Sequence, residues 1–436
     1  MLWLLIVAAV IHGVRQRKAS DSARSLGLSA GRDPVLVAFA SQTGLAEQIA
    51  WLTAETLSQA GTAARVVGLG TLTAADLKAS HRMLVIASTT GEGDAPDSLA
   101  SFVGRQMRAG ADLTGLSYAV LALGDRSYGA FCGFGRALDG WLEASGATAL
   151  FGRIEVDNGN PGSLRDWQRQ ISELTGQTID SDWTPRPFEP WRLVEREHLN
   201  PGSPGGEAYW LSFEPVGPVP AWKAGDIAEI ALPNPAEPAR DYSIASLPAD
   251  GRAEFIIRRR VGPDGSTGLG STWLTRDLIL GGEIGLRIRP NTAFHGPEHD
   301  VPLILIGNGT GIAGLRAHWR ARQGKAHGGV WLMFGERSSI HDAFLNDELK
   351  TAEASGALTR IDRAFSRDPS DGRYVQALVE ENVHALNDWI NRGAVILVCG
   401  SRNGMSTGVD EALIRCLGSE RTADLRESGR CRRDIY

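Results

Sequence analysis

The stretch SQTGLA, residues 41–46, places small hydroxyl side chains and a glycine between an apolar run and a helical pattern. Ser41 and Thr43 bring hydroxyl groups, and Gly44 leaves neighbouring backbone N–H groups accessible. Backbone N–H groups at the start of a helix form an anion site, so this stretch predicts a phosphate-binding loop. Ordinary capping of the helix by serine or threonine is the alternative interpretation.

Two further loops follow apolar runs in the same half of the chain. They are STTGEGDAPDS, residues 88–98, and LALGDRSYGAFCGFG, residues 121–135. Ligands of open α/β sheets bind at the carboxyl ends of the strands, where these loops would lie. The three loops would supply a phosphate cradle, an acidic glycine-rich loop and the aromatic ring of Tyr128, which could cover a planar ligand.

A glycine-rich turn follows another apolar run, LILIG, in the second half of the chain. Gly307, Gly309, Thr310 and Gly311 lie between that run and a helical pattern. Such glycines let a pyrophosphate approach the backbone at the helix N-terminus. Tight packing of the strand against the helix is the alternative explanation for them.

The segment RAFSRDPSDGRYVQ, residues 363–376, gathers Ser366, Arg367 and Arg373 with Tyr374 beside them. Hydroxyl and guanidinium groups suit a dianionic 2′-phosphate, whereas an NAD site would show a carboxylate for the ribose hydroxyl. The cluster predicts a preference for NADPH over NADH. A solvated basic loop is the alternative.

The elements that must position these loops follow from the apolar pattern. Continuous apolar runs at 35–40, 83–88 and 118–124 are typical of strands buried on both faces of a parallel sheet. Between the first two runs, residues 46, 49, 50, 53, 54 and 57 form one side of a helix. We expect a doubly wound α/β domain over residues 34–178.

The pattern changes after the proline-rich segment SDWTPRPFEPWR, which predicts a linker over 179–187. Over 188–297, short alternating pieces separated by glycine and proline predict an antiparallel β-barrel. The parallel pattern returns at 303–307, 330–335 and 395–400, which predicts a second, Rossmann-like α/β domain over 298–436. The expected fold class is therefore multi-domain α/β.

Composition narrows the range of functions. The 436 residues carry a formal net charge of −6, which argues against nucleic acid as the main partner and suits docking onto a basic protein. The four cysteines are Cys132, Cys399, Cys416 and Cys431, and they form no CxxC pair and show no metal-ligand spacing. We therefore expect no metal site and reduced thiols in the cytoplasm.

Residues 1–14 are apolar and are followed by RQRK. A secretory signal carries its positive charge before the apolar core, not after it, and a spanning helix needs roughly 20 apolar residues. The stretch is either a membrane-surface or partner-docking helix, or a short anchor with Arg15, Arg17 and Lys18 on the cytoplasmic side. We expect residues 1–33 to be an anchor and tether, with membrane attachment through residues 1–18.

The motifs of the first domain resemble the flavodoxin-like FMN domain of diflavin reductases, a family that includes the sulfite reductase flavoproteins and cytochrome P450 reductases. The resemblance is carried by SQTGLAE, STTGEGD, and LGDRSY followed by FC. It implies that residues 41–46 hold the FMN phosphate, that 89–93 contact the ring edge and that Tyr128 stacks on the ring. The implied FMN residues are Ser41, Gln42, Thr43, Gly44, Leu45, Ala46, Ser88, Thr89, Thr90, Gly91, Glu92, Gly93, Leu123, Gly124, Asp125, Tyr128, Phe131, Cys132 and Asp157.

The remaining motifs resemble the FAD and NADPH sites of the same family. RDYSIASLP, residues 240–248, is similar to its R-x-Y-S flavin signature, and GLGSTWL, residues 268–274, follows in the usual order. A strand edge with alternating polar residues is the alternative for R-x-Y-S alone. The implied residues are Arg240, Tyr242, Ser243, Gly268, Gly270, Ser271 and Thr272 for FAD, and Thr310, Ser366, Arg367, Arg373, Tyr374, Gln376 and Asn403 for NADPH.

The resemblance also implies a hydride-transfer set. LVCGSRNGM, residues 397–405, matches the family motif whose cysteine lies near the nicotinamide, and the final RRDIY is similar to the family C-terminus. Ser243, Cys399 and Asp434 would surround the hydride path, and Tyr436 would cover the FAD ring where nicotinamide must bind. A buried structural cysteine and a tyrosine packed in an unrelated groove are the alternatives.

The chain departs from the family in several places. Leu45 replaces a usual threonine, Thr90 replaces the stacking tyrosine of P450 reductases, Ser401 replaces their aspartate, and Arg373 stands in for a lysine. The long connecting domain that precedes R-x-Y-S in the family is missing. Interflavin geometry therefore cannot be taken over from the family.

The resemblance implies an NADPH-dependent diflavin oxidoreductase that passes electrons from NADPH to FAD, to FMN and then to a one-electron acceptor such as a haemoprotein. One alternative is a membrane-tethered reductase of ferric chelates, siderophores or another acceptor. A non-catalytic flavin-binding protein is a second, against which the retained Ser243, Cys399 and Asp434 argue. A nitric oxide synthase or P450 reductase module is disfavoured by the missing connecting domain and by Thr90.

Overall fold

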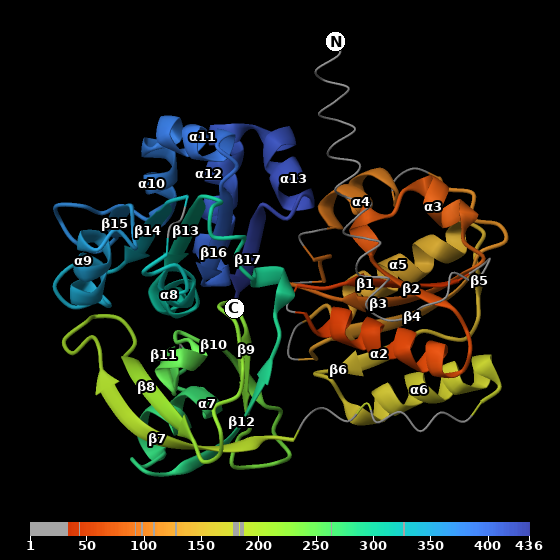
Figure 1. Ribbon diagram of the computed structural model, residues 1–436, viewed down its shortest axis with the longest axis horizontal. Coiled ribbons are helices and arrows are strands. Elements are labelled where there is room, and N and C mark those ends of the chain that lie inside the picture. Colours follow the sequence, from red (N-terminus) through yellow and green to blue (C-terminus); the bar gives the residue numbers. More distant parts are fainter. Residues whose placement is uncertain are drawn as a thin grey trace. The chain divides into compact units, whose positions relative to one another are not determined.

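Figure 1 shows a computed structural model that describes residues 34–177, 183 and 187–436, apart from 43, 92, 97–98, 108–109, 127–128, 263 and 326–327. The described residues form two compact units. The first comprises residues 34–41 and 45–183, and the second comprises residues 42, 44 and 187–436. The predicted anchor at 1–33 and most of the predicted linker at 179–187 lie outside the described residues.

A parallel sheet forms the centre of the first unit. Its strand order is β2-β1-β3-β4, with β5 and β6 both paired to β4, which is the flavodoxin-like doubly wound order. The strands are β1 Val35–Ala40, β2 Ala64–Gly68, β3 Arg82–Ser88, β4 Ser117–Gly124, β5 Thr148–Ala149 and β6 Ile154–Asp157.

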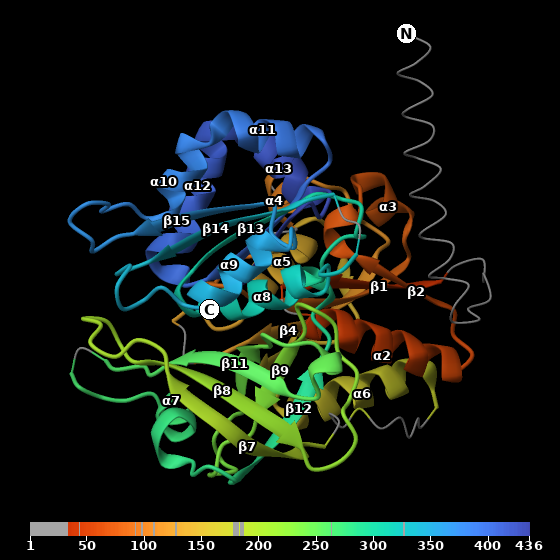
Figure 2. The ribbon, with the colours of Figure 1, turned by 60° about the vertical axis from the view of Figure 1, so that its left-hand side comes forward.

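Helices cover both faces of this sheet, as Figure 2 shows. Val35 and Val37 of β1 pack into one core cluster, and Leu36 and Ala38 pack into the other. A strand buried on both faces cannot alternate polar and apolar residues, which explains its continuous apolar run. The helices are α2 Leu45–Gln59 and α6 Pro161–Thr175 on one face, and α3 Ala74–Ala79, α4 Ala100–Arg105 and α5 Gly133–Ala144 on the other.

An antiparallel sheet forms the first part of the second unit, in the order β10-β9-β12-β7-β8-β11. Its interior holds fully buried aromatic rings, among them Trp191, Phe213 and Phe255. The strands are β7 Glu189–His198, β8 Ala208–Pro215, β9 Ile227–Ile230, β10 Arg240–Ser243, β11 Ala253–Arg258 and β12 Glu283–Arg289. The predicted change to short antiparallel strands is confirmed.

A second parallel sheet completes this unit, in the order β15-β14-β13-β16-β17. The strands are β13 Leu303–Asn308, β14 Val330–Glu336, β15 Arg360–Phe365, β16 Val395–Gly400 and β17 Cys431–Ile435. Its helices are α8 Ile312–Arg320, α9 Asn346–Ala354, α10 Val375–Glu381, α11 Val383–Asn391, α12 Thr407–Leu417 and α13 Ser419–Glu427. The predicted parallel α/β pattern is confirmed, and the sheet gains a fifth strand from the chain terminus.

The connection between β9 and β10 is short. Ile230 at the end of β9 pairs directly with Arg240 at the start of β10 in an antiparallel register. The span 231–239 therefore serves as a hairpin loop, with no domain inserted.

A membrane-crossing helix would have to be long and apolar throughout. None of the helices in the described part of the chain meets both conditions. The apolar stretch 1–14 is not among these residues.

Candidate active site

The carboxyl ends of β1 and β3 each carry a buried hydroxyl group. Ser41 Oγ follows β1 and Thr89 Oγ1 follows β3, and neither has a hydrogen-bond partner within the described structure. An unsatisfied buried hydroxyl costs about 1–3 kcal/mol, so a ligand that completes these bonds would relieve the cost. These two positions fit the phosphate and ring-edge contacts predicted for FMN.

The loops after β3 and β4 lie against each other at glycines. Gly93 adopts a φ of +108°, and a Cβ at Gly133 would lie 2.8 Å from its Cα. A Cβ at Gly124 would lie 2.7 Å from the backbone N of Cys132. Such close approach needs glycine at these positions. The two loops predicted to border one ligand therefore do meet.

Cys132 is buried where the loop after β4 leads into α5. It has a φ of 54°, and its buried thiol donates to the carbonyl oxygen of Ala122 at 3.3 Å. Burial raises the pKa of the thiol to about 11. The thiol thus shapes the turn into α5, and the FMN contact predicted for Cys132 stays a prediction.

Asp157, at the end of β6, is held by an arginine that the sequence reasoning did not single out. Its Oδ1 accepts from the backbone N–H of Arg126 at 3.0 Å, and its Oδ2 lies 3.6 Å from Arg126 Nε. The Arg126 guanidinium also lies 4.4 Å from the centroid of the Phe131 ring. The carboxylate thereby fixes the loop after β4. Three other predicted FMN residues, Thr43, Glu92 and Tyr128, lie outside the described residues.

In the second unit, the R-x-Y-S strand and the G-L-G-S-T turn come together as predicted. A Cβ at Gly270 would lie 3.1 Å from Arg240 Cγ and 3.2 Å from the hydroxyl of Tyr242. Thr272, only 4% exposed, has a buried hydroxyl without a partner in the described structure. The glycine and the unsatisfied hydroxyl at the start of a helical turn fit a pyrophosphate group.

Ser243, Cys399 and Asp434 come from three segments far apart in the sequence and meet at one point. Ser243 Oγ donates a 2.6 Å hydrogen bond to Asp434 Oδ2, and Cys399 Sγ lies 3.8 Å from the same oxygen. Cys399 and Asp434 are direct partners in the parallel register of β16 and β17. The three predicted hydride-transfer residues therefore form one cluster.

Burial determines the protonation of this cluster. Asp434 is 7% exposed, and burial raises its pKa, although the hydrogen bonds from Ser243 and Cys399 oppose the rise. Burial, and then the charge of Asp434, raise the pKa of the Cys399 thiol well above its ordinary value. The thiol is therefore neutral near pH 7, and the carboxyl group holds its proton more tightly than an exposed aspartate does.

Tyr436 lies next to this cluster and continues the pairing of β17. Its backbone N–H donates to the carbonyl oxygen of Gly400 at 3.2 Å, and its carbonyl oxygen accepts from the N–H of Arg402 at 3.0 Å. Its hydroxyl lies 3.1 Å from Thr310 Oγ1, and 56% of the residue is exposed. A tyrosine that is more than half exposed and is held by these three hydrogen bonds can be displaced by a ligand.

The glycine-rich turn after β13 packs against β16. A Cβ at Gly307 would lie 2.6 Å from the Cys399 carbonyl oxygen, and a Cβ at Gly311 would lie 2.2 Å from it. The tight packing given as the alternative is therefore present at these glycines, and the pyrophosphate contact at the start of α8 stays a prediction.

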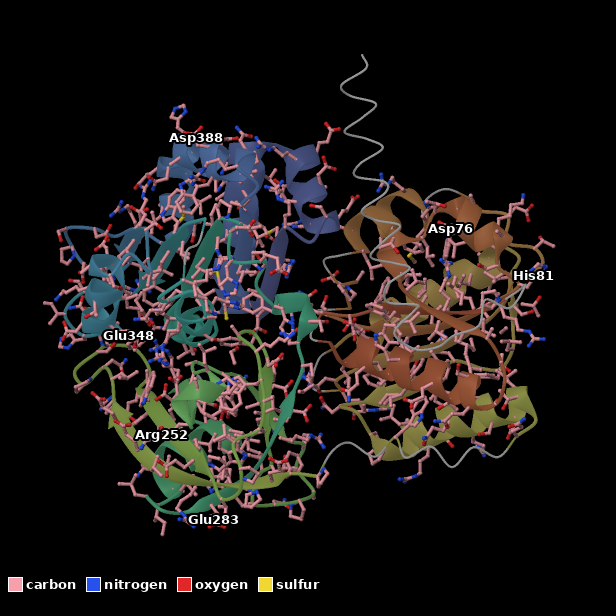
Figure 3. All side chains as sticks on the ribbon, viewed as in Figure 1. Asp76, His81, Arg252, Glu283, Glu348 and Asp388 are labelled. Atoms are coloured by element: carbon pink, nitrogen blue, oxygen red, sulfur yellow. The ribbon has the colours of Figure 1, made fainter. Side chains whose placement is uncertain are left out.

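Two arginines of α8 pair with three carboxylates, of which Glu254 and Asp250 belong to the antiparallel-sheet part and Glu348 belongs to α9. Arg316 Nη1 donates to Glu254 Oε2 at 2.8 Å, and Arg316 Nε donates to Glu348 Oε1 at 2.8 Å; Figure 3 labels Glu348. Arg320 forms a bidentate pair with Asp250 at 2.6 and 2.8 Å. These pairs fix the nucleotide helix next to Ser243.

The cluster predicted for the 2′-phosphate is only partly free to bind it. Arg373 donates to Asp371 at 2.5 Å and to Glu381 at 2.6 Å. The side chain of Arg367 is exposed and makes no ion pair with any described residue, and Ser366 lies beside it with its N–H bonded to the Glu336 carbonyl. Arg367 is therefore better placed than Arg373 to meet an incoming phosphate.

Comparison with known proteins agrees with both units. Residues 37–167 match the flavodoxin family, and residues 305–411 match the oxidoreductase NAD-binding domain family. The sulfite reductase [NADPH] flavoprotein alpha-component of Vibrio cholerae is 26% identical over 94% of this chain and 88% of its own length. The proteins of the same name from Photobacterium profundum and Shewanella oneidensis are 24% and 26% identical over 99% and 92% of this chain, and 94% and 89% of their own length.

The two matched domain families and these relatives support an NADPH-dependent diflavin oxidoreductase. The chain is an oxidoreductase whose cofactors are FMN, FAD and NADPH. The alignment with the V. cholerae protein runs over 542 positions, more than the 436 residues of this diflavin reductase, so the relative carries sequence that this chain lacks. The short hairpin between β9 and β10 lies where the sequence reasoning located the missing connecting domain.

The nucleotide contacts predicted for Asn403, Gln376 and Tyr374 stay predictions, as do those of the other predicted nucleotide residues. The side chain of Asn403 lies outside what the structure describes. Gln376 packs against α12, since a Cβ at Gly408 would lie 2.9 Å from its amide. Tyr374 is 53% exposed next to Arg373, where a planar base could stack on it.

Proposed function

We propose that this diflavin reductase delivers electrons from NADPH to a haemoprotein, with the haemoprotein of sulfite reduction as the first acceptor to test. The observation that carries the proposal is the single cluster of Ser243, Asp434 and Cys399, with Tyr436 beside it. The names of the relatives support this choice of acceptor.

The bound cofactors supply the redox chemistry, with hydride acceptance at FAD and single-electron delivery from FMN. The chain's own residues position the nicotinamide and hold protons. Ser243 Oγ, oriented by its 2.6 Å bond to Asp434, offers a hydroxyl next to the R-x-Y-S strand. Burial raises the pKa of Asp434, so its carboxyl group keeps a proton more readily than an exposed aspartate does, and the neutral Cys399 thiol lets an uncharged ring pack closely.

Tyr436 is proposed to cover the flavin until the nicotinamide displaces it. Its half-exposed ring and the contact with Thr310 support that role. Deletion of Tyr436 should ease the use of NADH and slow nicotinamide release, measured by steady-state and stopped-flow kinetics. If the protein without Tyr436 showed wild-type kinetics with both nucleotides, this role of Tyr436 would be refuted.

The acceptor is tested by mixing the purified protein with NADPH and a sulfite reductase haemoprotein, and assaying sulfide. Reduction of cytochrome c runs in parallel as a control that electrons leave FMN. Sulfide production supports the proposal. Rapid cytochrome c reduction without sulfide would exclude this acceptor, but it would still agree with diflavin reductase activity.

We also propose that residues 1–18 attach the enzyme to the cytoplasmic face of a membrane, as a tethered reductase of another acceptor would require. The apolar stretch followed by Arg15, Arg17 and Lys18 supports this. Membrane fractionation of the full chain and of a chain without residues 1–33 tests it. Equal recovery of both in the soluble fraction would refute membrane attachment.

A further inference from the structure

Asn308 joins the carboxyl ends of two neighbouring strands, β13 and β16. Its Nδ2 donates to Ser401 Oγ at 3.1 Å, and its Oδ1 accepts from the backbone N–H of Ser401 at 3.0 Å. The first bond binds the serine hydroxyl and the second binds the backbone. The amide therefore fixes both the side chain and the main chain of residue 401.

The backbone of Gly400 leaves room for this amide bridge. Gly400 adopts a φ of +145°, and a Cβ there would lie 2.3 Å from Asn308 Oδ1. Glycine alone tolerates both that conformation and that approach. The bridge is thus part of how β16 ends, and it involves neither Cys399 nor Asp434 directly.

Tyr436 is attached on both sides of this bridge. Its backbone bonds go to Gly400 and Arg402, which flank Ser401, and its hydroxyl contacts Thr310, which is two residues after Asn308. One anchor of the tyrosine therefore belongs to the end of β16, and the other belongs to the turn after β13. The Asn308 amide is the side-chain link between these two anchors.

We propose that Asn308 is a positioning residue that sets how firmly Tyr436 is held, and thereby how easily a nicotinamide ring displaces it. This inference rests on the proposed function of Tyr436. With the bridge in place, the backbone anchor and the hydroxyl anchor stay at a fixed distance from each other. Both anchors therefore hold the tyrosine at the same time. Without the bridge, β13 and β16 stay paired up to Gly307 and Cys399. Residue 401 beyond that pairing then loses its side-chain restraint, so the two anchors hold the tyrosine less firmly.

The test measures kcat/KM for NADH and for NADPH in four holoenzymes. They are the wild type, Asn308→Leu, a chain lacking Tyr436, and the combination of both changes. Leucine keeps the branched heavy-atom shape of asparagine and removes the hydrogen bonds between residues 308 and 401. Loss of these hydrogen bonds should raise the ratio of kcat/KM for NADH to kcat/KM for NADPH by about two- to tenfold when Tyr436 is present. The same loss should leave the ratio unchanged when Tyr436 is absent.

Asn387→Leu is the matched control. Asn387 lies in α11, where its Nδ2 donates to the Val383 carbonyl oxygen at 2.9 Å, away from the bridge. It should leave the ratio at its wild-type value. Ser401→Ala provides a milder variant, because it removes the hydroxyl bond and keeps the bond from the Ser401 backbone, so a smaller change in the same direction is expected.

The outcomes separate this inference from the proposal on which it rests. An unchanged ratio in Asn308→Leu and Ser401→Ala, together with a clear effect of deleting Tyr436, overturns the inference alone. An equal change in Asn308→Leu with and without Tyr436 also overturns it, because Asn308 would then act on the nucleotide directly. No effect of deleting Tyr436 overturns the role of the tyrosine itself.

Discussion

One added methyl group at Gly311 tests the assembly of the nucleotide site. Gly311 has a φ of −58° and a ψ of −20°, a backbone conformation that alanine adopts freely, so only space opposes the substitution. A Cβ there would lie 2.2 Å from the Cys399 carbonyl oxygen and 2.7 Å from Gly400 Cα. Both neighbours are backbone atoms, which cannot rotate away.

The expected magnitude follows from these distances. Ordinary contact begins at 3.4 Å, so the start of α8 and the end of β16 must separate. A displacement of about 1 Å at a reacting centre costs on the order of 100-fold in rate, and overpacking costs about 1–3 kcal/mol of folding free energy. Gly311→Ala should therefore slow flavin reduction on the order of 100-fold and lower the free energy of unfolding by about 1–3 kcal/mol, so that the variant still folds.

Anaerobic stopped-flow mixing with NADPH, followed by the loss of flavin absorbance, measures the rate, and thermal unfolding measures stability. Extraction and quantification of FMN and FAD show whether the variant still holds both cofactors. Gly217→Ala is the control in the same unit, because a Cβ there meets no atom within 4 Å. Wild-type reduction by Gly311→Ala, with both flavins bound, would refute the packing argument.

Three further predictions concern the hydride cluster and the phosphate site. Because burial raises the pKa of Asp434, the folded chain binds this proton more tightly than the unfolded chain, and wild-type stability should fall as pH rises from about 4 through the folded pKa. In Asp434→Asn, the fall of thermal stability with rising pH between pH 4 and 7 should become smaller. An unchanged dependence of stability on pH would show that Asp434 does not titrate in this range. Arg367→Ala should narrow the preference for NADPH more than Arg373→Ala does, because Arg373 already pairs with two carboxylates; equal effects on the ratio of kcat/KM would contradict this assignment. Cys399→Ala should slow flavin reduction about tenfold or more with FAD content unchanged, and loss of FAD instead would make the thiol a structural group.

The sequence was sufficient wherever a position is decided by a local pattern. The apolar run 35–40 became β1, and the helical face from Ala46 to Leu57 is the buried face of α2. The R-x-Y-S strand met its glycine turn because Gly270 is required by the approach of Tyr242. In each case the pattern reflects burial or a close backbone approach. Buried positions need apolar residues and close approaches need glycine, so the residue types alone indicate both.

Pairings between distant side chains could not be read in the same way. Arg373 stood in a basic motif, yet its charge is taken up by Asp371 and Glu381, which the motif itself does not reveal. Arg126 and Asn308 were missed because ion pairs and amide bridges depend on which strand ends become neighbours. The order of residues along the chain does not by itself tell which strand ends become neighbours.

The C-terminal strand shows how register converts a short motif into a site. In a strand, residues two apart share a face, and in β17 Arg433 pairs with Asp410 of α12 on one face of the sheet. Asp434 lies on the other face, opposite Cys399 and bonded to Ser243. Tyr436, two residues further, falls on that same face, where its hydroxyl reaches Thr310. The spacing of aspartate and terminal tyrosine therefore matters as much as their identities, and one residue inserted between them would turn the ring away from the nucleotide turn and leave Asp434 in place.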